Sequence, residues 1–155
     1  STVWSALVIG AWPASKKVID VPLHKFTTAE GERRVRAVSP ASEEGRRSIT
    51  LVKLAKAYEG YSLLDVTIKT GRTHQIRVHL AGEGHAIVGD GKYGDFPFNR
   101  VAQRQWGLRR MFLHSARLTL AHPVTKKRLA FESPLPQDLA DCLPRAGIRW
   151  KTQTG

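Results

Sequence analysis

The feature that most constrains the fold is a pair of strand patterns, residues 49–58 and 61–69, separated only by Glu59-Gly60. A short connection that contains glycine between two apolar runs is typical of a β-hairpin, because glycine readily adopts the backbone conformation of a tight turn. A helical pattern then begins at Thr73, almost directly after the second strand. The sequence therefore predicts an antiparallel hairpin followed at once by a helix.

Further short strands are predicted from apolar runs bounded by glycine, proline and polar residues. They span residues 3–9, 17–21, 33–38, 86–88, 112–120 and 128–131. The first two of these are expected to form a hairpin. The length of 155 residues is that of one ordinary domain. We therefore predict a single α+β unit over residues 1–155, with a mixed, mainly antiparallel β-sheet and flanking helices.

The composition indicates a polyanionic partner. Lys and Arg number 25 against 13 Asp and Glu, which gives a formal charge of +12. Such an excess favours nucleic acid through phosphate neutralisation. No apolar run is long enough to span a membrane, and none has the form of a signal peptide. The single cysteine, Cys142, cannot form an internal disulfide, so the cytoplasm is the expected compartment.

Two arginines, Arg72 and Arg77, lie around the predicted helix start. Cations are unfavourable there, because unpaired backbone N–H groups already carry partial positive charge, and a carboxylate or phosphate is therefore expected nearby. His74 and Arg77 are three residues apart and share a helix face. The alternative is that Arg77 makes an ordinary ion pair and His74 is a satisfied interior imidazole. The spacing alone leaves both interpretations open.

Three runs of sequence, in this order, carry a resemblance to a known family. They are TGRTHQIRVHL (70–80), GHAIVGDGKYGD (84–95) and LHSARLTLAHP (113–123). They closely resemble the motifs of the RluA-type RNA pseudouridine synthases. The looser stretch from VPLHKF through GERRVRAV (21–38) is most similar to the branch that acts on large-subunit ribosomal RNA. The resemblance identifies residues 1–155 with the C-terminal part of the catalytic domain.

The resemblance implies an enzyme that flips a uridine out of the RNA, breaks its glycosidic bond, rotates the base and rejoins it through carbon, with no metal or cofactor. The essential family residue is an aspartate in a His-Arg-Leu-Asp segment, upstream of the strand that opens this chain. No aspartate of this sequence has that context. Arg77 matches the family arginine that pairs with the aspartate. Without that aspartate, Arg77 is expected to be an unpaired cation.

The resemblance also implies a set of substrate-binding residues. The family has a tyrosine in the opening strand that stacks on the target base, and the matching position here is Trp4, which departs from the family pattern. A core position for this indole is the alternative. Arg72, Thr73, His74 and Gln75 belong to the matched motif and are expected to shape the pocket or to contact RNA phosphate.

Other patterns suggest chemistry that the sequence does not support. Gly89 to Gly94 satisfies GxGxxG, but we expect Asp95-Phe96-Pro97 to prevent the helix that a dinucleotide site needs, and Asp90 would face the phosphate, so no nucleotide cofactor is predicted. The six histidines have no metal-binding spacing, and no metal site is predicted. A GxSxG nucleophile elbow is absent from the sequence.

Two hypotheses follow. The first is an RNA pseudouridine synthase, acting on large-subunit ribosomal RNA, of which this chain alone is inactive. The second is a non-catalytic RNA-binding module of the same fold. Basic clusters at residues 33–36, 46–47, 109–110 and 126–128 could track phosphates, although each alone is more typical of a solvated face. Because the chain opens within a strand pattern, we also expect that strand to lack a neighbour, leaving an open edge and apolar surface.

Overall fold

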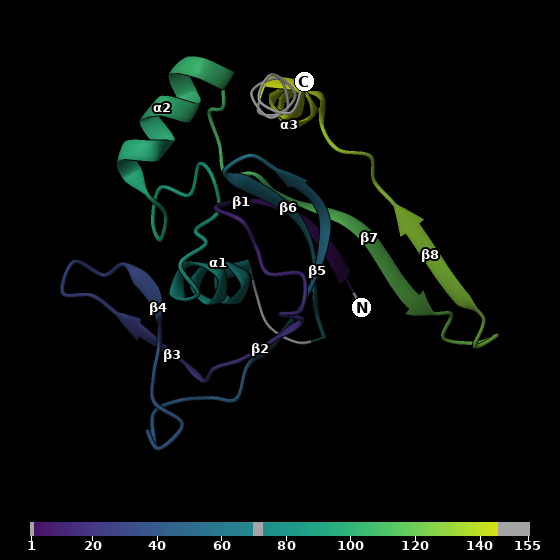
Figure 1. Ribbon diagram of the computed structural model, residues 1–155. Helices are drawn as coiled ribbons and strands as arrows, with labels where there is room; N and C mark the ends of the chain where they lie inside the picture. Colours follow the sequence, from purple (N-terminus) through teal and green to yellow (C-terminus); the bar gives the residue numbers. More distant parts are fainter. Residues whose placement is uncertain (1, 70–72, 146–155) are drawn as a thin grey trace.

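The structure is a computed structural model that describes residues 2–69 and 73–145. It is built on a six-stranded antiparallel sheet with strand order β2-β5-β6-β1-β7-β8, beside a separate β3–β4 hairpin (Figure 1). The strands are β1 (Thr2–Ile9), β2 (Val18–Asp20), β3 (Leu23–Thr27), β4 (Arg33–Ala37), β5 (Ile49–Tyr58), β6 (Tyr61–Ile68), β7 (Leu113–Ala121) and β8 (Arg128–Glu132). The helices are α1 (Thr73–Gly82), α2 (Phe96–Trp106) and α3 (Gln137–Ala140). The predicted fold class is confirmed.

The central hairpin is confirmed. β5 and β6 pair antiparallel up to Tyr58 and Tyr61, and Gly60 has a φ of 80°, a left-handed value that a residue with a Cβ adopts only at a cost. The predicted helix after β6 is also confirmed as α1. The sequence local to this region therefore determined its structure.

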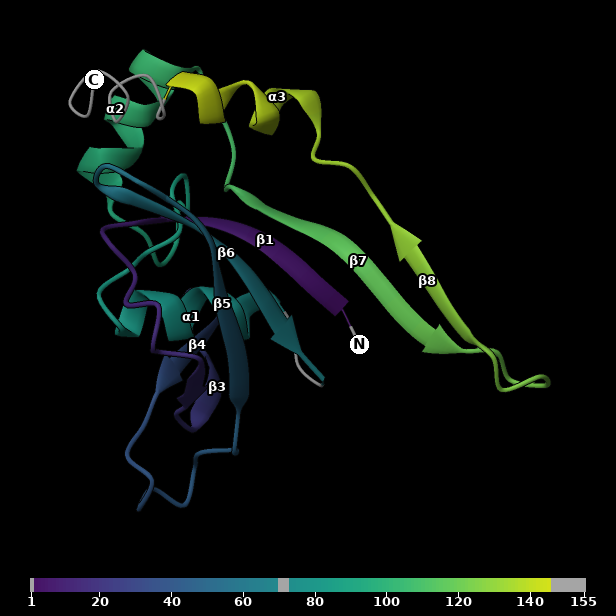
Figure 2. The same ribbon diagram turned by 45° about the vertical axis from the view of Figure 1, so that its right-hand side comes forward.

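The sheet separates two apolar clusters. On one face Ala6 and Val8 of β1 pack with Ile76 and Leu80 of α1. On the opposite face Leu7 of β1 packs in a cluster that also includes residues of α2 and α3. Figures 1 and 2 show the same division, with α1 on one side of the strands and α2 and α3 on the other. α1 is thereby held between the sheet and the β3–β4 hairpin.

The prediction that the first strand has an open edge is wrong. β1 lies in the interior of the sheet, paired with β6 on one side and with β7 on the other, because β7 returns to fill the edge that we expected to be open. Because β6 and β7 occupy both edges of β1, it does not form the expected hairpin with β2. β2 pairs with β5 instead. Apolar surface is nevertheless present on the sheet. Exposed large side chains there include Val18, Leu51, Leu118, Leu120 and Phe131.

Three further differences concern secondary structure. Residues 86–88 form only an isolated bridge, Val8 to Ile87, because the left-handed Gly84 and Gly89 limit the extended segment on both sides. β3 was not predicted, and it pairs with β4. α2 begins where we expected no helix: Asp95 accepts a hydrogen bond from the Phe98 amide as N-cap, and proline is tolerated in the first turn.

Among the described residues, no helix is long and apolar enough to cross a membrane.

Candidate anion and RNA-binding site

The centre of the candidate site is an ion pair between α1 and the loop that follows it. Arg77 donates from Nε to Asp90 Oδ2 over 2.9 Å and from Nη2 to Oδ1 over 2.8 Å. This two-bond geometry is the strong form of an arginine–carboxylate contact. The carboxylate that we expected near the start of this helix is therefore that of Asp90. The expectation that Arg77 is unpaired is wrong, because Asp90 is its partner.

Asp90 is itself fully buried, with an exposed fraction of 0%. Its Oδ1 also accepts hydrogen bonds from the amides of Lys92 and Tyr93, over 2.9 and 3.0 Å. Burial alone raises the pKa of Asp90, but the hydrogen bonds from Arg77 and the two amides outweigh it, so that the pKa lies below its ordinary value. The hydrogen bond to Asp90 in turn raises the pKa of Arg77. Both groups are charged at neutral pH.

Tyr93 joins this ion pair to the β3–β4 hairpin. The Arg77 guanidinium carbon lies 5.0 Å from the centroid of the Tyr93 ring, and that of Arg34 lies 5.2 Å from it. The Tyr93 hydroxyl accepts a hydrogen bond from the Val35 amide over 3.0 Å. Its proton is therefore directed to His74 Nδ1, also 3.0 Å away. Tyr93 thus contacts α1 and β4 at the same time.

His74 is held neutral by this arrangement. Because Nδ1 accepts the tyrosine proton, the imidazole proton resides on Nε2. Burial lowers the pKa of His74, and the positive charges of Arg77 and Lys92 lower it further. The predicted common face of His74 and Arg77 is confirmed, since both side chains contact the Tyr93 ring.

A second network fixes α1 against the sheet edge. His79 Nε2 donates to the Val21 carbonyl over 2.8 Å, and Nδ1 accepts from the Thr50 hydroxyl over 2.6 Å. Gln75 donates from Nε2 to Thr50 Oγ1 and to the Ile49 carbonyl, over 3.2 and 3.0 Å. The amide nitrogen of Gln75 is therefore engaged in holding α1 on β5.

This network predicts a pH dependence of stability. Burial lowers the pKa of His79, so its contribution is complete above the ordinary histidine pKa of about 6.5 and is lost as the pH falls through the lower folded value. We expect the free energy of unfolding, measured by urea titration, to decrease from pH 7.5 to pH 5.5. His79→Gln should make the slope of the free energy of unfolding against pH smaller than in the wild type, by the equivalent of up to one bound proton. Equal pH dependence in the wild type and the variant would contradict the assignment.

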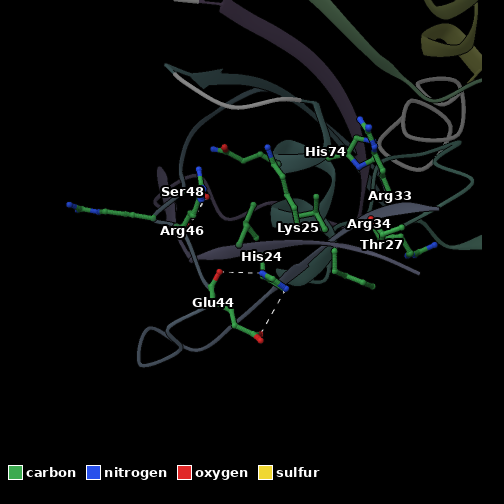
Figure 3. Close-up of a pocket in the computed structure, with 14 residues that line it drawn as sticks. His24, Lys25, Thr27, Arg33, Arg34, Glu44, Arg46, Ser48 and His74 are labelled. Atoms are coloured by element: carbon green, nitrogen blue, oxygen red, sulfur yellow. Dashed lines mark hydrogen bonds and ion pairs between the residues drawn. The ribbon is translucent and has the colours of Figure 1, made fainter. Parts of the chain in front are cut away.

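A groove of about 850 Å³ lies between the β3–β4 hairpin, the loop at residues 44–48 and the start of α1. Five basic side chains and one carboxylate, Glu44, line it. The basic residues are Lys25, Arg33, Arg34, Arg46 and Arg47. Figure 3 shows Arg33 and His74 toward one end, Lys25 in the middle, and Arg46 and Ser48 toward the other end. The groove therefore has the charge to bind a polyanion.

Three of these cations have no acidic partner. Within residues 2–69 and 73–145, the side chains of Lys25, Arg33 and Arg46 are exposed and make no ion pair or hydrogen bond. Arg34 and Arg47 are partly neutralised by Glu32 and Asp20. Beside the groove, Arg36 lies 5.5 Å from the centroid of Phe26, whose ring stacks on His24 at 6.3 Å. Cations next to aromatic faces are typical of single-stranded nucleic-acid sites.

The remaining sequence-predicted residues are placed as follows. Trp4 is half-buried on β1 and packs against the apolar cluster that contains Ile76 of α1. Its Nε1 is buried with no hydrogen-bond partner among the described residues. Thr73 is the first residue of α1. Arg72 lies outside the described residues.

Asp90 is the residue of this candidate site that the sequence patterns did not predict. The GxGxxG pattern places it in an unsuitable phosphate loop, whereas in the structure it is the partner of Arg77. Its position between two glycines, separated by one residue from the apolar run Ile87-Val88, was the available signal. No group of three or more His, Cys, Asp or Glu side chains suited to a metal ion occurs in the part of the chain that the structure describes.

Comparison with known proteins identifies the class of protein. The family model for RNA pseudouridylate synthases matches residues 11–82. Ribosomal large subunit pseudouridine synthase C of Escherichia coli K12 is 40% identical over 141 residues, which cover 90% of this chain and 43% of that protein. The protein of the same name from Pasteurella multocida is 41% identical over 138 residues, covering 89% of this chain and 41% of that protein.

Two solved human structures share the fold. RNA Pseudouridylate Synthase Domain Containing 4 matches with a TM-score of 0.71 and 22% identity, over 94% of this chain and 61% of that one. RNA Pseudouridylate Synthase Domain Containing 1 matches with a TM-score of 0.68 and 26% identity, over 91% of this chain and 58% of that one.

The chain belongs to the RNA pseudouridine synthases. Within that class it is of the RluA type, as its motifs predicted. It spans less than half the length of the curated relatives that it matches.

Proposed function

We propose that the full-length protein converts uridine to pseudouridine in large-subunit ribosomal RNA. The observation that carries the proposal is the 40% identity with relatives named for that activity, across 90% of this chain. The groove supports an RNA substrate, because its unpaired cations and neighbouring aromatic rings suit a phosphate backbone with unstacked bases. RNA as partner and a single cysteine fit a cytoplasmic protein.

In this proposal Arg77 is the arginine that pairs with the family aspartate during the reaction. A guanidinium beside that carboxylate keeps it ionised and oriented toward the ribose. Trp4 provides the aromatic face for the target base. Arg72, Thr73, His74 and Gln75 shape the pocket around them, with His74 facing the groove and Gln75 fastening α1. No metal or cofactor takes part in the proposed reaction.

The competing candidate is an RNA-binding module without catalysis, which the cationic groove also supports. The two differ in their need for the family aspartate, a residue that no aspartate within these 155 residues matches. We therefore expect the 155-residue chain to bind RNA without modifying it.

The test is to incubate the full-length protein and this chain separately with a large-subunit ribosomal RNA transcript and to measure pseudouridine by mass spectrometry. We expect product from the full-length protein only. Absence of product from the full-length protein, with RNA binding intact, would support the binding module instead.

A further inference from the structure

Only one edge of the Arg77 guanidinium makes hydrogen bonds to other described residues. Asp90 takes the edge formed by Nε and Nη2. Nη1 has no hydrogen-bond partner among residues 2–69 and 73–145, and 14% of the side chain remains exposed. Arginine has five N–H donors, so a second acceptor can bind while Asp90 stays in place. The side chain is fixed at one edge and available at the other.

The position of Asp90 is set by the loop around it. Asn99 of α2 donates from Nδ2 to the Asp90 carbonyl over 2.8 Å, and its Oδ1 accepts from the Gly89 amide over 2.8 Å. Gly89 has a φ of 85°, and a Cβ on it would lie 2.4 Å from the Arg110 carbonyl oxygen. These contacts hold the loop in a conformation that directs the Asp90 carboxylate at Arg77.

Tyr93 restricts the guanidinium from its face, 5.0 Å from the ring centroid. A cation over an aromatic ring is attracted by the ring quadrupole, so this contact opposes tilting of the guanidinium plane. Together, Asp90 fixes the in-plane orientation of Arg77 and Tyr93 fixes its plane.

We propose that Asp90 is a positioning residue for the reaction: it orients Arg77 so that Nη1 can bind the carboxylate of the family aspartate. This inference rests on the function proposed above. Asp90 acts through Arg77 and does not contact the reacting atoms. The negative charge of Asp90 offsets the positive charge of Arg77. The pair therefore acts on the family aspartate mainly through directed hydrogen bonds.

The test is Asp90→Asn in the full-length protein, which keeps the size of the side chain and removes one acceptor and the charge. We expect kcat for pseudouridine formation to fall by on the order of tenfold, with KM changed by less than about twofold, since orientation matters mainly in the transition state. In the ¹⁵N spectrum of the wild type we expect a slowly exchanging Nε–H signal from Arg77, because Nε donates to Asp90, and we expect Asp90→Asn to lose it. Asp138→Asn removes the exposed two-bond partner of Arg110 and is the matched control.

A second variant guards against loss of folding. Asn99→Ala removes the loop support without altering the carboxylate, and we expect a smaller decrease in kcat, again with unchanged KM. An active wild-type protein in which Asp90→Asn loses the Arg77 signal but keeps the full kcat would overturn the inference. An inactive wild-type protein would instead refute the proposed function.

Discussion

Replacing Arg77 with alanine should lower the free energy of unfolding by about 3–5 kcal/mol. The substitution leaves the Asp90 carboxylate fully buried without its cation. The two amides that also bind Oδ1 remain, but they cannot replace a guanidinium that binds both oxygens. Urea unfolding of the 155-residue chain at pH 7 measures the effect.

The matched control is Arg110→Ala. Arg110 binds Asp138 through the same two-bond geometry, over 2.7 and 2.9 Å, but on the surface. Water solvates both groups once the pair is broken, so the free energy of unfolding should be almost unchanged. The double variant Arg77→Ala/Asp90→Ala should recover part of the loss, because it removes the buried charge. Similar losses in Arg77→Ala and Arg110→Ala would contradict the role of burial.

The parts of the fold that the sequence predicted are those fixed by neighbours along the chain. The Glu59-Gly60 turn and the strand patterns on either side determine the central hairpin, and the spacing of Ile76 and Leu80 determines α1. The need for an anion near Arg77 also followed from local electrostatics at a helix start. In each case the physical cause lay within a few residues of its effect.

The missed features depend on contacts between distant segments or on a misjudged residue. Nothing in the pattern of α1 indicates that its arginine binds Asp90, which is 13 residues further along the chain. The interior place of β1 depends on β7, more than a hundred residues away. α2 was not predicted, because proline usually ends a helical pattern. The N-cap at Asp95 places Pro97 in the first turn, where its missing N–H costs little.

At about 0.1 M salt, the affinity of the proposed groove for RNA should fall roughly 100-fold when Lys25, Arg33 and Arg46 are all replaced by glutamine. Each of these exposed cations can release counterions from a phosphate, at a slope of about 0.7 per contact for single strands. The slope of log affinity against log salt concentration should therefore decrease in magnitude by about 2. Fluorescence anisotropy with a uridine-containing single-stranded 12-mer RNA, at a series of salt concentrations, measures both quantities.

A control triple variant separates the groove from net charge. Lys126→Gln/Lys127→Gln/Arg128→Gln removes the same charge from the β7–β8 hairpin, which extends away from the groove in both views (Figures 1 and 2). If the groove is the binding surface, this variant should change affinity by only a few-fold through the weaker overall field, and its salt slope should stay close to that of the wild type. Equal losses in the two triple variants would mean that RNA is attracted by the whole basic surface and that the groove has no specific part in binding. A loss confined to the groove variant would localise the strand beside His74, and hence next to the Tyr93 ring that contacts Arg77.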